Sequence, residues 1–474
     1  MPSMRHPYAN TRYLSQSLST DALDSWLQLT PDTEAAPEQL RAMPQLHRTG
    51  SSYMSAPSDR SSDGLPRVDV CMSSFASESS GHFVKHSSSA TLLLSGQEDG
   101  RSEAEYTNGA TIEGILAVPR PSGLLSLQVR VEGSMKLQET AGSGSSALQI
   151  INDLAFEWDA EHNATFPSKV TFRYTLPTHY SHDLTGERFR LPPSYRAHLS
   201  GVPGLRVDIS YAVAVYITRN RSKANWWRKS TSLRVPFTYR ELSRPTLAGP
   251  FVANLTKTPT IPRTVFRYTA ESRRNSWDDI KVELYLPHSQ ICSMCDLIPF
   301  SVTFFAPEEV LCRYTTFRPS PESFHPLASP VADSANYVPG QLFSCFMPCP
   351  SPVRLQLLRR TTVDVLAAGV YAAPKERTDI TTTKVLASGI VYSASRGMNS
   401  AVWSGHVIVP NKVGCGGFVA KGIRVTDCLV LTLAHPSSLR NEYAEFYQSV
   451  PIRLTTQTYD RSDGVLTISD WSTL

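Results

Sequence analysis

Two closely spaced cysteine pairs are the residues whose types and spacing come nearest to a metal site. The pairs are Cys292-x-x-Cys295 and Cys345-x-x-x-Cys349, and four thiolates at such spacings can hold a tetrahedral zinc ion. However, the first pair interrupts a strand-like run, no second C-x-x-C follows at zinc-ribbon distance, and cysteine is a common small apolar residue of protein cores. We therefore predict that the eight cysteines are reduced thiols, as is usual in the cytosol, with no metal and no other cofactor.

The sequence also lacks the common signatures of catalysis. It contains no G-x-S-x-G, no H-E-x-x-H, no G-x-x-x-x-G-K-[ST] and no H-x-E paired with P-C-x-x-C. The run Gly414-Cys415-Gly416-Gly417 lacks the third glycine of a dinucleotide-binding fingerprint, and we predict a tight turn there. We predict a protein without enzymatic activity. The alternative of another class is a β-sandwich carbohydrate-active enzyme with two carboxylates facing each other in a cleft.

A candidate phosphorylation site lies in a polar stretch of the second half of the chain. Arg273-Arg274-Asn275-Ser276 has the form that basophilic kinases recognise. Phosphate on Ser276 would add a charge of about −1.5 to −2 beside two arginines and could order the nearby chain. The alternative is a chance match, because such short strings are common.

A second surface motif combines neighbouring aromatic and cationic residues. Trp226, Trp227, Arg228 and Lys229 are consecutive and fall between predicted strands. Such a loop can contact a membrane, with the indole rings at headgroup depth and the cations against anionic lipid. The alternative is a tryptophan packed beneath the loop, with its charged neighbours in solvent.

Length and composition bound the remaining possibilities. A chain of 474 residues predicts two or three domains. Hydrophobic residues make up 41%, charged residues make up 19%, and the net charge is only +4. Because the Lys and Arg residues are dispersed, we predict no nucleic-acid partner. The sequence has neither a signal peptide nor an apolar run of membrane-spanning length, which predicts a cytoplasmic protein.

Short runs of β-branched, aromatic and leucine residues between turn residues predict an all-β fold. In RVDISYAVAVYI, alternation places Val207, Ile209, Tyr211, Val213 and Val215 on one buried strand face. Sandwiches of two sheets would bury such faces. The predicted organisation is a disordered Ser/Pro-rich tail (1–88), a first β-sandwich (89–245), a Pro-rich linker (246–265), a second β-sandwich (266–460) with a Pro-rich insertion at about 313–352, and a short tail (461–474).

Several phrases, in their order along the chain, resemble the fungal arrestin-like (α-arrestin) family. GATIEGILAVPRPSGLLSLQVRVEGSMKL looks like an early hairpin, and FRLPPSYRAHLSGVPGLRVDISYAVAVYITR with LRVPFTYRELSRP is similar to a long central strand and a closing strand. VELYLPHSQICSMCDLIPFSVTF resembles the hairpin that opens the second lobe. GIRVTDCLVLTLAHP and VPIRLTTQTYD resemble its last two strands. The resemblance covers residues 90 to 460 and implies two tandem arrestin-type, immunoglobulin-like β-sandwich domains.

The resemblance further implies a non-catalytic adaptor of the cytoplasm, recruited transiently to the plasma membrane or endosomes. Its partners would be membrane transporters or receptors, and its role would be endocytic trafficking or signalling. Family members of the α-arrestin type recruit HECT-type ubiquitin ligases, whose WW domains bind PPxY motifs. The alternative within binding proteins is an arrestin-fold subunit of a sorting coat complex.

One PPxY match is present, formed by Pro192, Pro193, Ser194 and Tyr195. A WW domain would grip the prolines as a polyproline turn and the tyrosine as an aromatic anchor. The match lies between predicted strands of the first sandwich, whereas the family's working motifs lie chiefly in flexible tails. The alternative is a structural loop in which Tyr195 packs on the sandwich.

Overall fold

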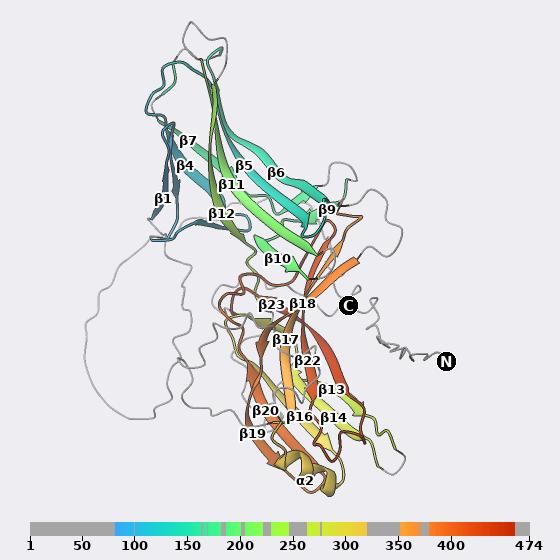
Figure 1. The fold of residues 1–474 in the computed structure, drawn as a ribbon. Coiled ribbons are helices and arrows are strands. Elements are labelled where there is room, and N and C mark those ends of the chain that lie inside the picture. The colour runs from blue at the N-terminus through green and yellow to red at the C-terminus, as the bar shows by residue number, and fades with distance from the viewer. Residues whose placement is uncertain are drawn as a thin grey trace, which may run out of the picture. The chain divides into compact units, whose positions relative to one another are not determined.

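The computed structural model describes residues 81–459, with gaps at 99, 163–164, 168, 182–185, 201–203, 221–228, 246–262, 275–276, 320–350, 369 and 371–378. All of these described residues belong to one compact unit, Ser74–Asp470. The regular secondary structure of the described residues is nearly all β-strand (Figure 1), which confirms the predicted all-β class. Within the described ranges, no helix has the length and apolar character needed to cross a membrane.

The N-terminal strand group, as we call β1 to β12, forms two main sheets. One has the strand order β1-β2-β4-β7, and the other has the order β3-β12-β11-β5-β6, with β10 paired to β11. The strands are β1 His82–His86, β2 Thr91–Ser95, β3 Ala104–Thr107, β4 Thr111–Ala117, β5 Leu124–Glu139, β6 Ser145–Asp159, β7 Lys169–Thr175, β8 His179–Ser181, β9 Arg188–Arg190, β10 Tyr195–Leu199, β11 Leu205–Arg219 and β12 Lys229–Arg240.

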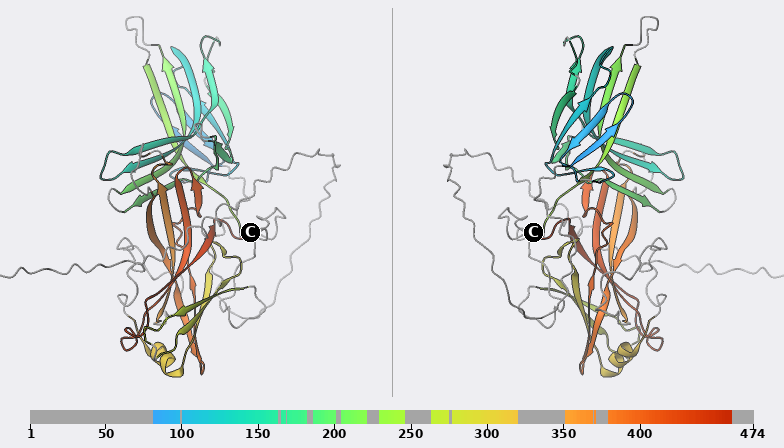
Figure 2. Two further views of the ribbon diagram at one scale, coloured as in Figure 1. Left: turned by 90° about the vertical axis from the view of Figure 1, so that its right-hand side faces the viewer. Right: turned by 90° about the vertical axis from the view of Figure 1, so that its left-hand side faces the viewer.

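The C-terminal strand group, β13 to β23, forms two further sheets. Their orders are β13-β14-β16-β20-β19 and β15-β23-β22-β17-β18, with β21 paired to β22. A helix, α2 (Glu308–Thr316), lies at the end of the strands (Figures 1 and 2). The strands are β13 Arg263–Ala270, β14 Ile280–Pro287, β15 Ile291–Ser293, β16 Ile298–Phe305, β17 Val353–Asp364, β18 Asp379–Ser388, β19 Ile390–Arg396, β20 Ser400–Val407, β21 Phe418–Ala420, β22 Ile423–Leu433 and β23 Phe446–Thr455.

The second strand group repeats the topology of the first. The order β3-β12-β11-β5-β6 corresponds strand for strand to β15-β23-β22-β17-β18, and β1-β2-β4-β7 corresponds to β13-β14-β16-β20. Even the parallel pairs match, because β3 lies parallel to β12 and β15 lies parallel to β23. The repeated topology indicates that both groups bury the apolar faces of their strands with the same arrangement of sheets.

Alternation along the strands explains how the sheets bury their inner faces. Val207, Ile209, Tyr211, Val213 and Val215 of β11 are all buried in one apolar core, as the sequence predicted. β11 is central in its sheet and pairs with β5, β10 and β12. Burial of these side chains stabilises the fold by about 25 cal/mol per Å² of apolar surface removed from water.

Two apolar cores fill the described structure, and the first is shared between the strand groups. It contains residues of β2, β5 and β11 together with Val363, Phe418 and Val425 of the second group. The second core contains only residues of the C-terminal strand group, among them Leu355, Leu357, Trp403 and Leu429. The two strand groups are therefore joined by apolar burial.

Some strands fall where the sequence suggested other structure. β1 lies inside the stretch predicted as tail, β13 begins inside the predicted linker, and α2 extends into the predicted insertion. β1 reads HFVKH and has a mostly exposed side-chain pattern, since it is an edge strand whose polar residues hide the strand signal. The predicted domain bounds otherwise stay predictions.

The early hairpin expected from GATIEGILAVPRPSGLLSLQVRVEGSMKL is wrong. Its two strands, β4 and β5, belong to different sheets, because β4 pairs with β2 and β7 whereas β5 pairs with β6 and β11. The hairpin expected from VELYLPHSQICSMCDLIPFSVTF in the second group is confirmed, since its strands β14 and β16 pair antiparallel. Alternation identifies a strand but does not identify its neighbour.

Candidate functional site: a buried ion pair between two cores

A charged pair interrupts the aliphatic inner face of two neighbouring strands. Along β17, the inward residues run Leu355, Leu357, Arg359, Thr361, Val363, and the first two belong to the second core whereas Val363 belongs to the first. Along β22, the inward residues are Val425, Asp427 and Leu429. Val425 belongs to the first core and Leu429 belongs to the second. Because Arg359 and Asp427 are register partners, the charges meet at the boundary between the cores.

The geometry of this pair is that of a two-pronged salt bridge. Arg359 Nε donates to Asp427 Oδ1 at 2.8 Å, and Arg359 Nη2 donates to Asp427 Oδ2 at 3.0 Å. Nη2 also donates to the carbonyl oxygen of Cys415 at 2.7 Å. Both charged residues are buried. A planar guanidinium suits such a site because its fixed fork of donors matches a carboxylate.

The pKa values of Arg359 and Asp427 are shifted by burial and by the attraction between the two groups. Burial disfavours the charge of Arg359, but attraction and hydrogen bonding to Asp427, together with the influence of Cys415 and Tyr195, outweigh this cost and raise the pKa of the guanidinium. Burial is the larger effect on Asp427 and raises the pKa of its carboxyl group, against the opposing influence of Arg359. The guanidinium stays charged throughout the physiological range, and its two hydrogen bonds to Asp427 favour the ionised carboxylate.

The segment that carries Cys415 reaches the pair because its flanking residues are glycines. A Cβ at Gly416 would meet the carbonyl oxygen of Leu454 at 2.2 Å, and one at Gly417 would meet that of Val425 at 2.8 Å. The expected tight turn is wrong. Residues 414–417 run in irregular structure without a turn, and Gly416 and Gly417 allow them to pass close to β22 and β23.

Tyr195, from the PPxY match, contacts this site from the N-terminal strand group. Its hydroxyl group lies 2.7 Å from Thr361 Oγ1 on β17. Its ring meets Phe418 of β21 edge-on, with centroids 5.2 Å apart. Burial raises the pKa of the Tyr195 hydroxyl. Tyr195 thus occupies the place that the structural alternative assigned to it, packed on the sandwich.

The prolines of the same match are part of the fold. Pro192 and Pro193 are buried, and Tyr211 Oη donates to the Pro192 carbonyl oxygen at 2.6 Å. Ser194 N donates to the Tyr239 carbonyl at 2.9 Å, and Ser194 Oγ accepts from Tyr239 N at 2.9 Å. A WW domain would have to break these contacts to grip the motif, so the arrangement favours a structural role.

Two further sets of polar contacts join the strand groups. Lys421 Nζ lies 2.8 Å from Glu187 Oε2, and Lys421 N donates to Tyr180 Oη at 3.1 Å. After β12, Ser243 N donates to Thr456 Oγ1 at 2.9 Å and Gln457 N donates to the Ser243 carbonyl at 3.0 Å. Together with Tyr195, these contacts hold the strand groups in one arrangement.

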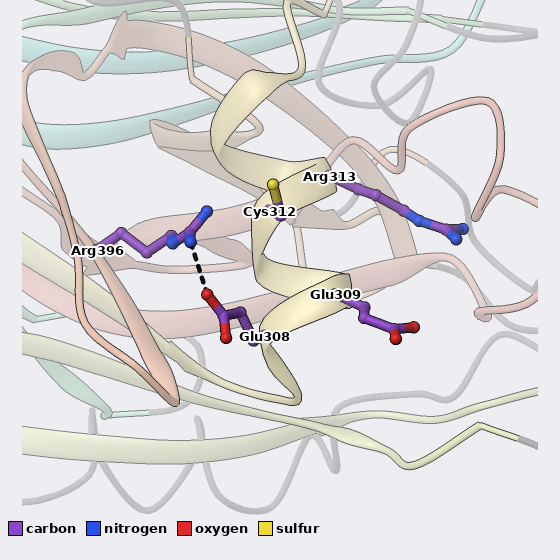
Figure 3. A pocket seen from close by; sticks show the side chains of 5 residues that line it. All are labelled: Glu308, Glu309, Cys312, Arg313 and Arg396. Carbon is purple, nitrogen blue, oxygen red and sulfur yellow. Dashed lines mark hydrogen bonds and ion pairs between the residues drawn. The ribbon is translucent and has the colours of Figure 1, made fainter.

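A shallow hollow beside α2 is a second place where polar side chains gather (Figure 3). Arg396 Nη2 donates to Glu308 Oε1 at 2.9 Å, while Arg313 points away over the ring of Trp277, 5.4 Å from its centroid. The carboxylates of Glu308 and Glu309 point in opposite directions (Figure 3). They do not form the facing pair that a glycosidase would need.

The cysteine pairs do not form a metal site within the described residues. Cys292 is buried in β15 and Cys295 is exposed after it, while Cys345 and Cys349 lie outside the described residues. No group of three His, Cys, Asp or Glu side chains among the described residues could hold a metal ion.

Most of the other candidate residues lie outside the described part of the chain. Trp226, Trp227 and Arg228 are outside it, as is Ser276, and of Lys229 only its place at the start of β12 is described. The membrane-contact loop and the phosphorylation site therefore stay predictions.

The site formed by Arg359, Cys415 and Asp427 was not predicted from the sequence. The available signal was a charged residue at an inward position of an otherwise aliphatic alternation, as in IRVTDCLVL, where Asp427 takes the place of an aliphatic residue. No family model matches this chain, and no curated protein matches it in sequence.

Proposed function

We propose that this protein is a non-catalytic adaptor of arrestin type that binds the cytoplasmic segments of membrane transporters or receptors. The observation that carries the proposal is the repeated strand topology of residues 82–240 and 263–455. The phrases that resemble the family lie on corresponding strands of the two groups, such as β11–β12 and β22–β23. Fold analogy provides the link from topology to function.

The contacts between the strand groups support a binding role in a second way. Tyr195 of β10 is hydrogen-bonded to Thr361 of β17, Lys421 N donates to the Tyr180 hydroxyl, and Ser243 N donates to Thr456 Oγ1. Such contacts are directional, so they fix the register in which two sheets meet more sharply than apolar packing alone. An adaptor needs a fixed arrangement of its surfaces in order to present a composite binding face.

The adaptor proposal is tested by proximity labelling with the full chain in the native cell. The expected result is enrichment of plasma-membrane transporters or receptors over a cell that expresses the labelling enzyme alone. Stable, stoichiometric co-purification with a constant set of subunits would instead identify a sorting coat component. Absence of membrane proteins from the labelled set would overturn the proposal.

Recruitment of a HECT-type ubiquitin ligase is the finer part of the proposal and is tested separately. A peptide spanning Arg188–Leu199 and the full chain are each titrated with a WW domain. Binding by both would support recruitment through Pro192, Pro193 and Tyr195. Binding by the peptide alone would show that the fold conceals the motif, and the adaptor proposal would then stand without the ligase.

A further inference from the structure

One sheet of the N-terminal strand group carries a row of apolar side chains on its outer face. Val84 of β1 is the register partner of Leu93 of β2, and Leu93 is the partner of Ile115 of β4. Directly opposed residues of a sheet point to the same face, so the three side chains form one row across three strands. We call them the apolar row. Val84 is 42% exposed, Ile115 is 37% exposed and Leu93 is half-buried.

The apolar row points away from the core. The neighbours of these residues along β2 and β4 include Leu92, Leu94 and Leu116, which are fully buried in the first core, and Phe83 of β1 packs against that core. Successive side chains of a strand point to opposite faces, so the row lies on the outer face. Figure 1 shows β1, β4 and β7 together at one side of this strand group. The fold thus leaves an apolar strip of this sheet open to solvent.

Two cationic side chains flank one end of the row. Ile115 is the register partner of Thr171 on β7. Lys169 and Arg173 lie two residues to either side of Thr171, so they share its outward direction, and both are exposed. Arg173 Nε lies 3.1 Å from Glu113 Oε1 in an exposed ion pair. Within the described part of the chain, Lys169 has no such ion pair.

The spacing of the row fits a helix better than an extended chain. Neighbouring strands lie about 4.8 Å apart, so the three side chains span about 9.6 Å. A helix laid across the strands presents one side chain per turn of about 5.4 Å, and its positions i and i+7 are about 10.5 Å apart. An extended chain would present a side chain on one face every 6.6–6.8 Å, or roughly 13 Å for three. One apolar helix residue can therefore meet each of the three strands.

We propose that the apolar row is a docking surface for an amphipathic helix of a partner protein, with acidic residues beside its apolar stripe. The apolar stripe covers the row, and the carboxylates pair with Lys169 and Arg173. This charge complementarity selects an acidic helix over a basic one. Helix α2 of a second copy is unsuited as the occupant, because its apolar residues Val310, Leu311 and Tyr314 are buried. The inference does not depend on the adaptor proposal, because it requires no membrane protein.

The test uses stapled helical peptides that are titrated into the full chain at low salt. The first peptide has leucines at positions i, i+4 and i+7 with glutamates beside them, and the second has lysines in place of the glutamates. The acidic peptide is expected to bind more tightly to the wild type. Ile115→Ser should weaken it about tenfold, since a covered apolar side chain is lost. Lys169→Glu should shift the preference toward the basic peptide.

Leu154→Ser provides the matched control. Leu154 is 43% exposed on β6, in the other sheet of the same strand group, and its replacement should leave the affinity unchanged. Val84→Ser is the second variant should Ile115→Ser not fold, and it is expected to weaken the acidic peptide as well.

Three results would overturn the proposal. The first is an acidic peptide that does not bind, or that binds no better than the basic one. The second is equal weakening by Leu154→Ser and Ile115→Ser, because binding would then not depend on the row. The third is a wild-type dimer in sedimentation that Ile115→Ser abolishes, which would identify a second copy as the occupant.

Discussion

Arg359 and Asp427 face each other as register partners across β17 and β22, joined by two hydrogen bonds of 2.8 and 3.0 Å. Their neighbours along the inner face, Leu357 and Leu429, belong to one core, and Val363 and Val425 belong to the other. The ion pair is thus the polar boundary between two apolar interiors. Its energetic role can be measured because each partner can be removed alone or together.

Removal of one charge should be costly. Asp427→Asn leaves the buried guanidinium of Arg359 without its counter-charge, and the free energy of unfolding is expected to fall by about 3–5 kcal/mol. The combined change Arg359→Met with Asp427→Leu should lose less, since no charge is left buried. Urea unfolding of both variants measures the loss of unfolding free energy. The control is Arg267→Ala, which removes the exposed partner of a surface ion pair and is expected to lose less than about 1 kcal/mol. Equal losses in the single and combined variants would contradict the prediction.

The hydroxyl group of Tyr195 should stabilise the contact between β10 and β17. Tyr195→Phe keeps the ring on Phe418 but leaves Thr361 without this partner. The expected loss of unfolding free energy is about 0.5–1.5 kcal/mol. A double-mutant cycle with Thr361→Val measures the coupling, and a coupling energy of zero would show that the hydrogen bond contributes nothing.

Two glycines of the same short run should respond differently to a methyl group. Gly416→Ala would bring a Cβ to 2.2 Å from the Leu454 carbonyl oxygen, whereas a Cβ at Gly414 has nothing within 4 Å. We expect Gly416→Ala to lose about 1–3 kcal/mol and Gly414→Ala to be close to neutral. Thermal unfolding of the pair provides the comparison, and a Gly414→Ala variant as unstable as Gly416→Ala would contradict the close approach of residues 413–417 to β23.

Acidification should destabilise the fold through His406. Burial lowers the pKa of His406 below its ordinary value of 6.5. Above that value both the folded and the unfolded chain hold a neutral ring, and below it the unfolded chain takes up the proton first. Stability is therefore complete above about pH 6.5 and is lost as the pH falls, by up to about 1.4 kcal/mol per pH unit. Urea unfolding at pH 7.5, 6.5 and 5.5 measures this slope, and it should be smaller in His406→Gln.

The thiols should differ widely in reactivity. Burial raises the pKa of Cys292 to about 12, and Cys415 is also buried, whereas Cys312 is exposed on α2. At pH 8 we expect iodoacetamide to alkylate Cys312 in the folded protein long before Cys292 or Cys415. Peptide mass spectrometry over a time course resolves the sites. Early alkylation of Cys292 would contradict its burial in β15.

The sequence by itself determined the all-β class and the buried face of β11. Both follow from local alternation, since a period of two places Val207 to Val215 on one side of a strand wherever that strand lies. It could not distinguish a WW-domain-binding motif from a structural loop at residues 192–195, because a short motif has the same sequence in a flexible tail and in a packed loop. Its signal was weakest at β1, where edge-strand residues resemble an unstructured tail.

Only the tertiary structure decided which strands are neighbours, and with them the site. β4 and β5 are adjacent in sequence but lie in different sheets, and Arg359 and Asp427 are 68 residues apart yet directly paired. Strand partners are chosen by long-range burial and hydrogen bonding, and many pairings are compatible with the same alternation. The meeting of Arg359, Asp427, Cys415 and Tyr195 is a property of that choice, because each residue comes from a different strand or loop.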